Sequence, residues 1–295
     1  MTRSADPSRQ GQAAQGGRVA IVAGGGALPG ELAAGLLPPA RPPFLVIIED
    51  QPDTDPELFG YEHRMLKVED YGTLISMLRR AGATHVVLAG GISRRPALRS
   101  IRWNFGLLKM LPRVVAGLAR GDDGILRTIV RHLEAEGFHV VGAHELLPDL
   151  VAPEGQLSKA KPSTAERRNI AAAMEAARAI GALDIGQAAV AVRGRVVALE
   201  GAEGTAEMIE RVHRLRSAGR IGKAGGVLVK CAKPNQELRA DLPAIGPDTV
   251  RSVHAAGLAG IAVEAGRAIM LHRKELVEIA DELGIFVTGV PGGKS

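Results

Sequence analysis

The residues best suited to chemistry lie close together in the second half of the chain, after a short apolar run. Between Lys230 and Asp241 the sequence packs two lysines, an arginine, a glutamine and two acids into 12 residues. Cations offset the charge of a phosphoryl group in transfer, and a carboxylate can orient water or hold magnesium. The segment therefore predicts phosphate chemistry, and its candidate residues are Lys230, Lys233, Gln236, Arg239 and Asp241.

A glycine-rich segment near the start of the chain is the second candidate. It follows the apolar run from Arg18, and its small residues would let backbone amides and a helix N-terminus approach a phosphate. The sixth position of a dinucleotide fingerprint is Pro29 and not glycine, so the pattern favours a nucleotide or phosphate cradle over a dinucleotide site. A tight turn without a ligand is the alternative. The cradle residues would be Gly24, Gly25, Gly26, Ala27 and Leu28.

Two further polar groups follow predicted strands or open helices. Gly90, Gly91 and Ser93 come after the run ending at Ala89, at a strand's carboxyl end, where open α/β sheets collect ligands. The arginines that follow could meet a phosphate or simply be solvated. Asp122 and Asp123 open a helix, and we expect one to cap it while the pair could help to hold magnesium.

A third group lies at predicted turns of the second half, where sites are commonly built. Asp184 and Gln187 precede a hairpin, and Glu200, Glu203 and Thr205 follow it. Thr205 could equally be only a helix N-cap.

Apolar periodicity predicts the elements that position these residues. Runs at 18–24, 44–48, 85–89 and 138–141 read as parallel strands, with helices at 71–80 and 125–135 between them. After a proline-rich stretch come a helix at 166–180, a hairpin at 188–192 and 196–200, and strands at 227–230, 260–264, 268–271 and 285–287. Helices are expected at 206–215, 249–256 and 274–283.

The sequence thus predicts two α/β domains, an N-terminal Rossmann-like parallel sheet and a C-terminal mixed domain. The expected division is a disordered leader at 1–17, a first domain at 18–150, a linker at 151–165 and a second domain at 166–295.

Composition narrows the function classes. A single cysteine excludes an internal disulfide and a cysteine zinc site, and with no signal peptide or spanning run it favours the cytoplasm. The net charge of +5 suits phosphate ligands or an anionic membrane, and we expect no nucleic-acid partner. Basic and apolar residues alternate over 98–120 and could rest on a membrane or pack on the sheet. No P-loop, HExxH pair or histidine-rich two-metal cluster is present.

Several motifs, taken in order, resemble one family. The segments IVAGGGALPG, GDD, GAHELL, DIGQAAVAVRGRVVALEGAEGTAEMIERV, KPNQELRADLPAIGPDTV and GLAGIAVEAGRAIM are similar to the LpxI family of UDP-2,3-diacylglucosamine pyrophosphatases. The resemblance implies magnesium-dependent hydrolysis of UDP-2,3-diacylglucosamine to UMP and 2,3-diacylglucosamine 1-phosphate, a step of lipid A synthesis. It also implies a substrate held between two domains, a homodimer, and transient contact with the cytoplasmic face of the inner membrane.

The resemblance also implies roles for residues. The family's essential aspartate falls on Asp241, which would hold a magnesium-bound water, with Asp122 and Asp123 as further metal candidates. Many relatives carry aspartate in place of Glu237, so the role of that position stays open. As a hypothesis beside the resemblance, Lys233 and Arg239 are expected to be catalytic and Lys230 to contact the substrate, and all three would offset developing charge. The other expected substrate contacts are residues 24–28, Gly90, Gly91, Ser93, Gln187, Thr205 and Gln236.

Two alternatives remain at this stage. A nucleotide-dependent oxidoreductase is supported by the glycine loop and by Glu49, about 20 residues beyond it, but Pro29 opposes that reading. A non-catalytic lipid or nucleotide carrier would use the same cleft without needing Asp241.

Overall fold

The computed structural model describes residues 17–36, 42–92, 121–234 and 236–292, with the side chains of residues 121 and 122 left out. Two compact units emerge. The first comprises Met1–Pro148 with Arg239–Asp241, and the second comprises Asp149–Leu238 with Leu242–Ser295. Ser93 and the basic stretch at 98–120 lie outside the described residues, as does the predicted leader except for Gly17.

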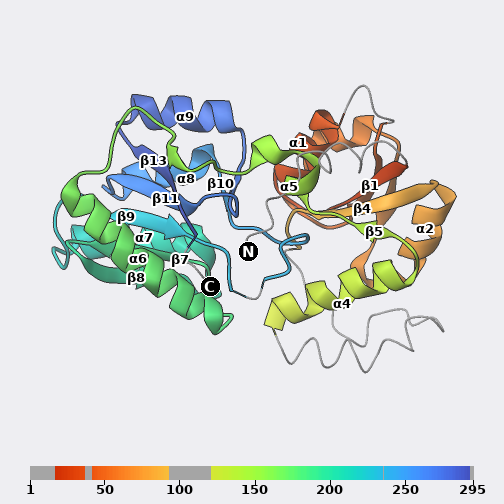
Figure 1. The fold of residues 1–295 in the computed structure, drawn as a ribbon, viewed down its shortest axis with the longest axis horizontal. Coiled ribbons are helices and arrows are strands. Elements are labelled where there is room, and N and C mark those ends of the chain that lie inside the picture. Colours follow the sequence, from red (N-terminus) through yellow and green to blue (C-terminus); the bar gives the residue numbers. More distant parts are fainter. Residues whose placement is uncertain (1–16, 37–41, 93–120, 235, 293–295) are drawn as a thin grey trace, which may run out of the picture. The chain divides into compact units, whose positions relative to one another are not determined.

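The first unit is built on a five-stranded parallel sheet in the order β3-β2-β1-β4-β5, of which Figure 1 labels β1, β4 and β5. The chain runs outward from β1 on one side, then returns to place β4 on the other side of β1. This reversal between β1 and β4 is where open α/β sheets form their ligand crevice. The strands are β1 Arg18–Ala23, β2 Phe44–Ile48, β3 His63–Leu66, β4 Ala83–Ala89 and β5 His139–Val140.

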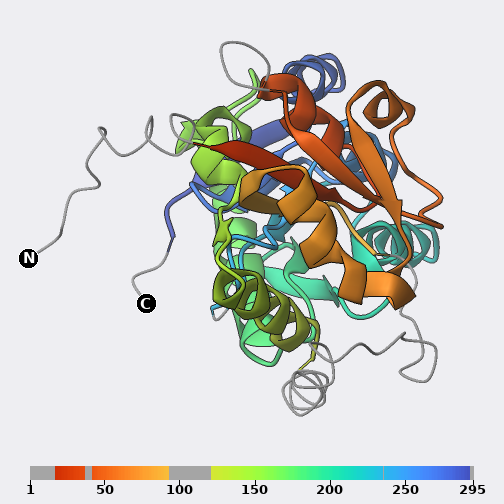
Figure 2. The same ribbon diagram turned by 90° about the vertical axis from the view of Figure 1, so that its right-hand side faces the viewer.

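Helices flank this sheet (Figure 2). Pro29 stands in the first turn of α1, where its missing N–H is not needed. Val130 and Leu133 of α4 and Leu78 of α2 are fully buried in one core with Val86 of β4. The helices are α1 Leu28–Gly35, α2 Leu74–Arg80, α4 Gly121–Ala135 and α5 Ala143–Leu146, with 3₁₀ helices η2 Pro56–Gly60, η3 Val68–Thr73 and η5 Pro148–Leu150.

The helix expected at 71–80 is divided in the structure. Its first residues belong to η3, and α2 begins only at Leu74. Asp70, at φ −96° and ψ 19°, departs from helical geometry, and Thr73 donates its hydroxyl to the Asp70 carbonyl at 2.9 Å. Local side-chain bonds of this kind compete with a regular helix start.

The second unit contains a six-stranded mixed sheet in the order β6-β13-β11-β9-β7-β8. Strands β9, β11 and β13 are parallel, and the remaining pairings are antiparallel. The strands are β6 Gly155–Gln156, β7 Ala188–Val192, β8 Arg195–Leu199, β9 Val227–Lys230, β11 Gly260–Glu264 and β13 Phe286–Val290; β10 Ala244–Ile245 and β12 Ile269–Met270 form a separate pair.

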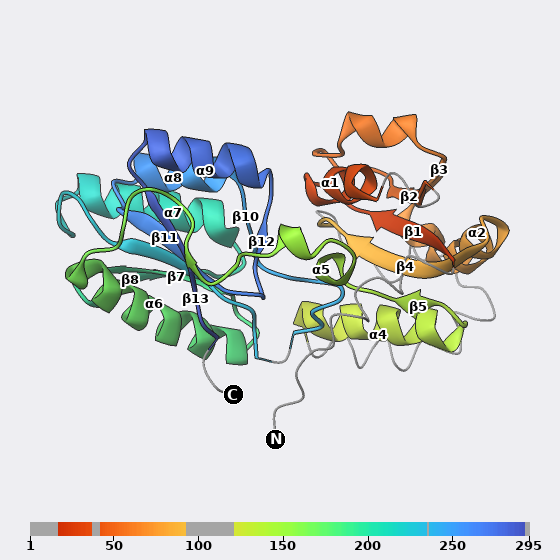
Figure 3. The ribbon, with the colours of Figure 1, turned by 45° about the horizontal axis from the view of Figure 1, so that its top comes forward.

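Helices cover both faces of the six-stranded sheet, and Figure 3 shows α6 on one face with α7, α8 and α9 on the other. Ala173 and Ala177 of α6 are fully buried in one core with Val229. On the other face Met208 of α7 and Leu276 of α9 are equally buried. The bounds are α6 Thr164–Ala182, α7 Gly204–Ser217, α8 Pro247–Ala255 and α9 Arg273–Glu282. The predicted fold class is confirmed.

Residues 151–165, which composition assigned to a linker, carry ordered structure in the second unit. Ala152 is fully buried in the core, and β6 pairs with β13. The buried Ser158 hydroxyl donates to the Ile285 carbonyl at 3.1 Å and accepts from the Val287 amide at 2.7 Å. These bonds tie the stretch to the start of β13.

Helices long and apolar enough to span a bilayer were not found in the part of the chain that the structure describes.

Candidate functional site

The two predicted glycine segments of the first unit meet at the carboxyl ends of β1 and β4. Gly24 donates its amide to the Ala89 carbonyl at 2.8 Å. Gly25 donates to the Gly91 carbonyl at 2.8 Å, and the Gly91 amide returns a bond to the Gly25 carbonyl at 3.0 Å. The fold therefore joins the two segments at the point where the strand order reverses.

This pairing explains why glycines stand there. A Cβ added to Gly24 would collide with the Gly91 carbonyl, and one added to Gly90 would collide with the Gly25 carbonyl. Gly90 also adopts φ +85°, a conformation that side chains disfavour.

The amides of the glycine loop are occupied. Besides the bonds of Gly24 and Gly25, the Gly26 amide donates to the Asp53 carbonyl at 3.0 Å, and the Asp53 carboxylate lies against Gly25. In this conformation these three amides do not form a phosphate cradle. The first helical amides of α1, after Ala27, have no intrahelical acceptor.

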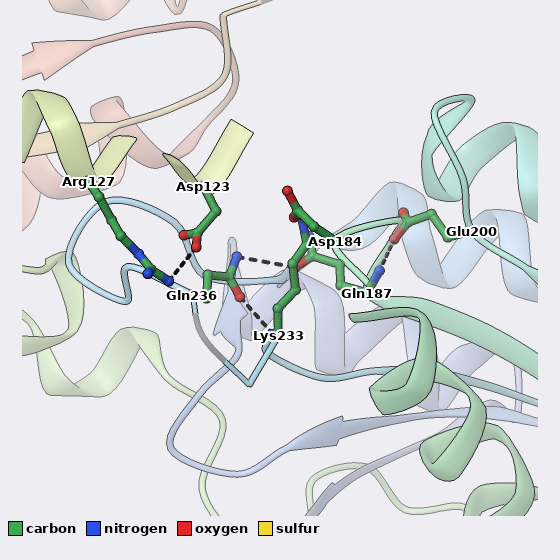
Figure 4. Close-up of polar contacts among 7 residues, drawn as sticks. All are labelled: Asp123, Arg127, Asp184, Gln187, Glu200, Lys233 and Gln236. Atoms are coloured by element: carbon green, nitrogen blue, oxygen red, sulfur yellow. Dashed lines mark hydrogen bonds and ion pairs between the residues drawn. The ribbon is translucent and has the colours of Figure 1, made fainter. Parts of the chain in front are cut away.

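Asp122 and Asp123 lie in the first turn of α4. Asp123 accepts from Arg127 Nη2 at 2.5 Å, one helical turn further on (Figure 4). The side chain of Asp122 is outside the described part. The Asp123 carboxylate is thus already committed to a cation of its own helix.

In the second unit, the predicted polar segment follows β9, and Lys233 contacts Asp184, which the sequence analysis placed at the turn before the hairpin without a specific role. Lys233 Nζ lies 2.6 Å from Asp184 Oδ1, and the two side chains are only 17% and 30% exposed (Figure 4). Asp184 follows α6 and has φ +55°. Lys230 is buried and donates to the Ala244 carbonyl at 2.9 Å, so it ties the end of β9 to β10.

Two glutamines continue the network. Gln236 Oε1 accepts from the Lys233 amide at 2.9 Å, which closes a short loop. Gln236 Nε2 lies 3.5 Å from Gln187 Oε1, at the limit of a hydrogen bond (Figure 4). The structure thus brings Gln187 to the segment that holds Lys233 and Gln236, although 49 positions separate Gln187 from Gln236 in the sequence.

Glu200 completes the network, although the sequence had named it only as part of a turn. One of its oxygens accepts from the Gln187 amide at 2.8 Å, and the other accepts from the Thr205 hydroxyl. Thr205 does not cap α7, because the N-cap is Glu203 and no side chain bonds to that helix start. The sequence signal for Glu200 is its place at the end of the predicted hairpin, while its burial is seen only in the structure.

Arg239 and Asp241 belong with the first unit, although the chain around them belongs to the second. Arg239 Nη1 lies 2.5 Å from Glu134 Oε1 of α4, and Ala240 packs against the core that α4 covers. The predicted catalytic residues are therefore divided between the units: Arg239 and Asp241 in the first, Lys233 in the second.

Among the residues that the structure describes, a metal site made by the protein alone was not found. Across residues 17–36, 42–92, 121–234 and 236–292, no group of three or more histidine, cysteine, aspartate or glutamate side chains is placed to hold an ion. A magnesium ion there would need oxygens from a ligand, which is how this ion is commonly bound with phosphates.

Comparison with known proteins gives three matches that agree: two domain models and one relative. The LpxI N-terminal domain model matches residues 18–150, and the LpxI C-terminal domain model matches residues 153–288. The UDP-2,3-diacylglucosamine pyrophosphatase LpxI of Caulobacter vibrioides is 39% identical over 275 residues, which cover 92% of this chain and 97% of that protein.

Proposed function

The chain belongs to the LpxI family, and we propose that it hydrolyses the pyrophosphate of UDP-2,3-diacylglucosamine to UMP and 2,3-diacylglucosamine 1-phosphate. The observation that carries the proposal is the identity of 39% with a protein of that name along almost its whole length. Both units take part in the match, so the likeness is not confined to a nucleotide-binding fold.

The reaction needs water to attack one phosphorus of the pyrophosphate. A bond forms from the water oxygen to that phosphorus, the bond from phosphorus to the bridging oxygen breaks, and protons are released as two monophosphates form. Negative charge builds on the bridging oxygen, so fixed cations lower the barrier. Lys233, held by Asp184, and Arg239, held by Glu134, are the cations that we assign to this role.

Asp241 is the residue that we assign to the attacking water. A carboxylate can orient a water molecule and accept its proton. Magnesium, when bound, would supply further neutralisation of the pyrophosphate and activate water. Asp241 and the phosphate oxygens of the substrate would together suit this ion, because one or two protein carboxylates are enough for magnesium when phosphates supply the other ligands. Asp123 is the weaker candidate because Arg127 already pairs with it.

Substrate contacts are proposed for the ends of β1 and β4 in the first unit and for the glutamine network in the second. The start of α1 after Ala27 suits a diphosphate better than the glycine amides do, because those amides already have acceptors. Gln187 and Thr205 are held by Glu200, so they are preorganised for polar contacts. Lys230 and Gln236 fix the loop that carries Lys233.

The lipid substrate leads us to propose a peripheral encounter with the cytoplasmic face of the inner membrane, in a homodimeric protein. Sedimentation with anionic vesicles tests the first part, and light scattering of the purified chain tests the second.

The deciding experiment is release of UMP from UDP-2,3-diacylglucosamine in detergent, with magnesium or with a chelator. We expect Asp241→Ala to lower turnover at least about a hundredfold, because the water would lose its partner. The matched control is Asp248→Ala, which removes an exposed carboxylate of α8 and should keep full turnover.

Undiminished turnover in Asp241→Ala would remove this residue from the mechanism, and full turnover with the chelator would remove magnesium. Substrate binding by the folded wild type without UMP release would instead favour a carrier.

A further inference from the structure

A buried carboxylate lies at the carboxyl end of β11, outside the network described above. Glu264 is the last residue of that strand and is only 2% exposed. Burying a carboxylate is costly unless it is paired and hydrogen-bonded. A carboxylate in this buried position therefore needs a partner for each of its two oxygens.

One oxygen of Glu264 faces two cations. Arg178 Nη2 of α6 lies 3.9 Å from Oε1, and Arg267 Nη1 lies 3.6 Å from the same atom. These distances are too long for good hydrogen bonds, so the attraction is between charges. The two arginines balance a charge that would otherwise be isolated.

The other oxygen of Glu264 accepts a hydrogen bond from the backbone. Glu264 Oε2 accepts from the Ala232 amide at 3.1 Å. Ala232 is the second residue after β9 and directly precedes Lys233. Bonds from a carboxylate to a backbone amide are stronger than those between neutral groups.

The amides on either side of Ala232 are held as well. The Cys231 amide donates to the Gln187 carbonyl at 3.0 Å, and the Lys233 amide donates to Gln236 Oε1 at 2.9 Å. Three successive amides thus have fixed acceptors, and Glu264 supplies the middle one. These three bonds fix the backbone at Lys233 independently of the contact between its side chain and Asp184.

We propose that Glu264, with its charge balanced by Arg178 and Arg267, is a positioning residue that fixes Lys233 for the reaction. The proposal rests on the function proposed above, since it assigns a support to a cation of that site. Small displacements of a catalytic group are enough to slow a reaction strongly.

The test variant is Glu264→Gln, which keeps the shape of the side chain and removes its charge. We expect kcat to fall by up to about a hundredfold with little change in KM, because the cation is displaced while ground-state contacts remain. We also expect Lys233 to react severalfold faster with an amine-modifying reagent, measured peptide by peptide in a mass spectrometer. Its ammonium is largely covered in the wild type.

The matched control is Glu166→Gln. Glu166 Oε1 accepts from the Gly226 amide at 3.3 Å, just before β9, so this variant removes a carboxylate from the opposite end of the same strand. It should leave both kcat and the labelling of Lys233 near their wild-type values. If Glu264→Gln does not fold, Arg267→Gln tests the same cluster at a residue more exposed than Glu264, with smaller changes of the same sign.

Equal effects of Glu264→Gln and Glu166→Gln on kcat and labelling would overturn the proposal. A fall in kcat with unchanged labelling of Lys233 would overturn it too, because the effect would not pass through this lysine. Absence of UMP release by the wild type would refute the proposed function, while the labelling result would still decide whether Glu264 places Lys233.

Discussion

Lys233 shows how far a side chain's setting depends on residues distant in sequence. Its ammonium contacts Asp184, its amide contacts Gln236, and the residue before it is held by Glu264. The sequence predicted Lys233 and Gln236 from the density of polar residues. It could not predict Asp184 or Glu264 as partners, because both come from elements that only the folded sheet brings to the end of β9.

Cys231 should be an unreactive thiol. Burial raises its pKa to about 11, and the nearby Glu264 charge acts in the same direction. Only a thiolate attacks alkylating reagents, so at about pH 8 we expect iodoacetamide to modify the native chain far more slowly than the urea-unfolded chain. Mass spectrometry measures the rate of modification directly, because the chain has one cysteine. Equal rates in the native and unfolded chains would show that the thiol is not protected.

The same raised pKa bears on the free energy of unfolding. Below the ordinary pKa of 9.0 the thiol is protonated in both states, and its contribution is fully present. Between that value and about 11 the unfolded chain loses the proton while the folded chain keeps it, so stability falls as pH rises. A Cys231→Ala variant should lack this part of the pH dependence.

At the scale of elements, the glycine segments form a backbone joint between β1 and β4. Gly90→Ala should destabilise the first unit by roughly 1–3 kcal/mol for its strained backbone, and by more for the clash with the Gly25 carbonyl. Unfolding by urea, followed by circular dichroism, measures the loss.

Gly82→Ala is the control for Gly90→Ala. Gly82 has φ +68° with nothing within 4 Å of an added Cβ, so this variant carries the backbone strain alone, roughly 1–2 kcal/mol. Equal losses of unfolding free energy in the two variants would show that the clash between an added Cβ at position 90 and the Gly25 carbonyl contributes nothing.

The elements themselves were largely predictable, and the exceptions have physical causes. The wholly apolar β2 was evident, as was β9, which is apolar up to its last residue Lys230, because both faces of such strands are buried. The edge strand β3, with the sequence HRML, was not predicted because its two middle residues, the charged Arg64 and the apolar Met65, are both exposed and so give no apolar alternation. The two-residue β6 gives no pattern at all, since it depends on pairing with β13.

At the scale of the whole molecule, the two units have separate hydrophobic cores. The core of the second unit has two parts, one on each face of its six-stranded sheet. We expect heat unfolding of the full chain to be more complex than a single transition, with a calorimetric enthalpy larger than the van't Hoff enthalpy. Differential scanning calorimetry gives both quantities. Gly90→Ala should shift only the part that belongs to the first unit. Coincident enthalpies would mean that the units unfold together.

The candidate site was predictable in its residue types and not in its division between units. Polar density marked Lys233, Arg239 and Asp241 as one segment, and periodicity assigned the whole segment to the second half. The structure groups Arg239 to Asp241 with the first unit because Ala240 packs on its core and Arg239 pairs with Glu134. Such a grouping depends on contacts between residues about 100 positions apart, which local pattern does not reveal.

This grouping also bears on the order in which the protein can be made. The first unit includes residues 239–241, so a nascent chain that has emerged only as far as Pro148 lacks part of that unit. Domains usually fold one after another as they leave the ribosome. Here the first unit is complete only after residues 239–241 have been synthesised, and Asp241, the residue assigned to the attacking water, is one of those last three residues.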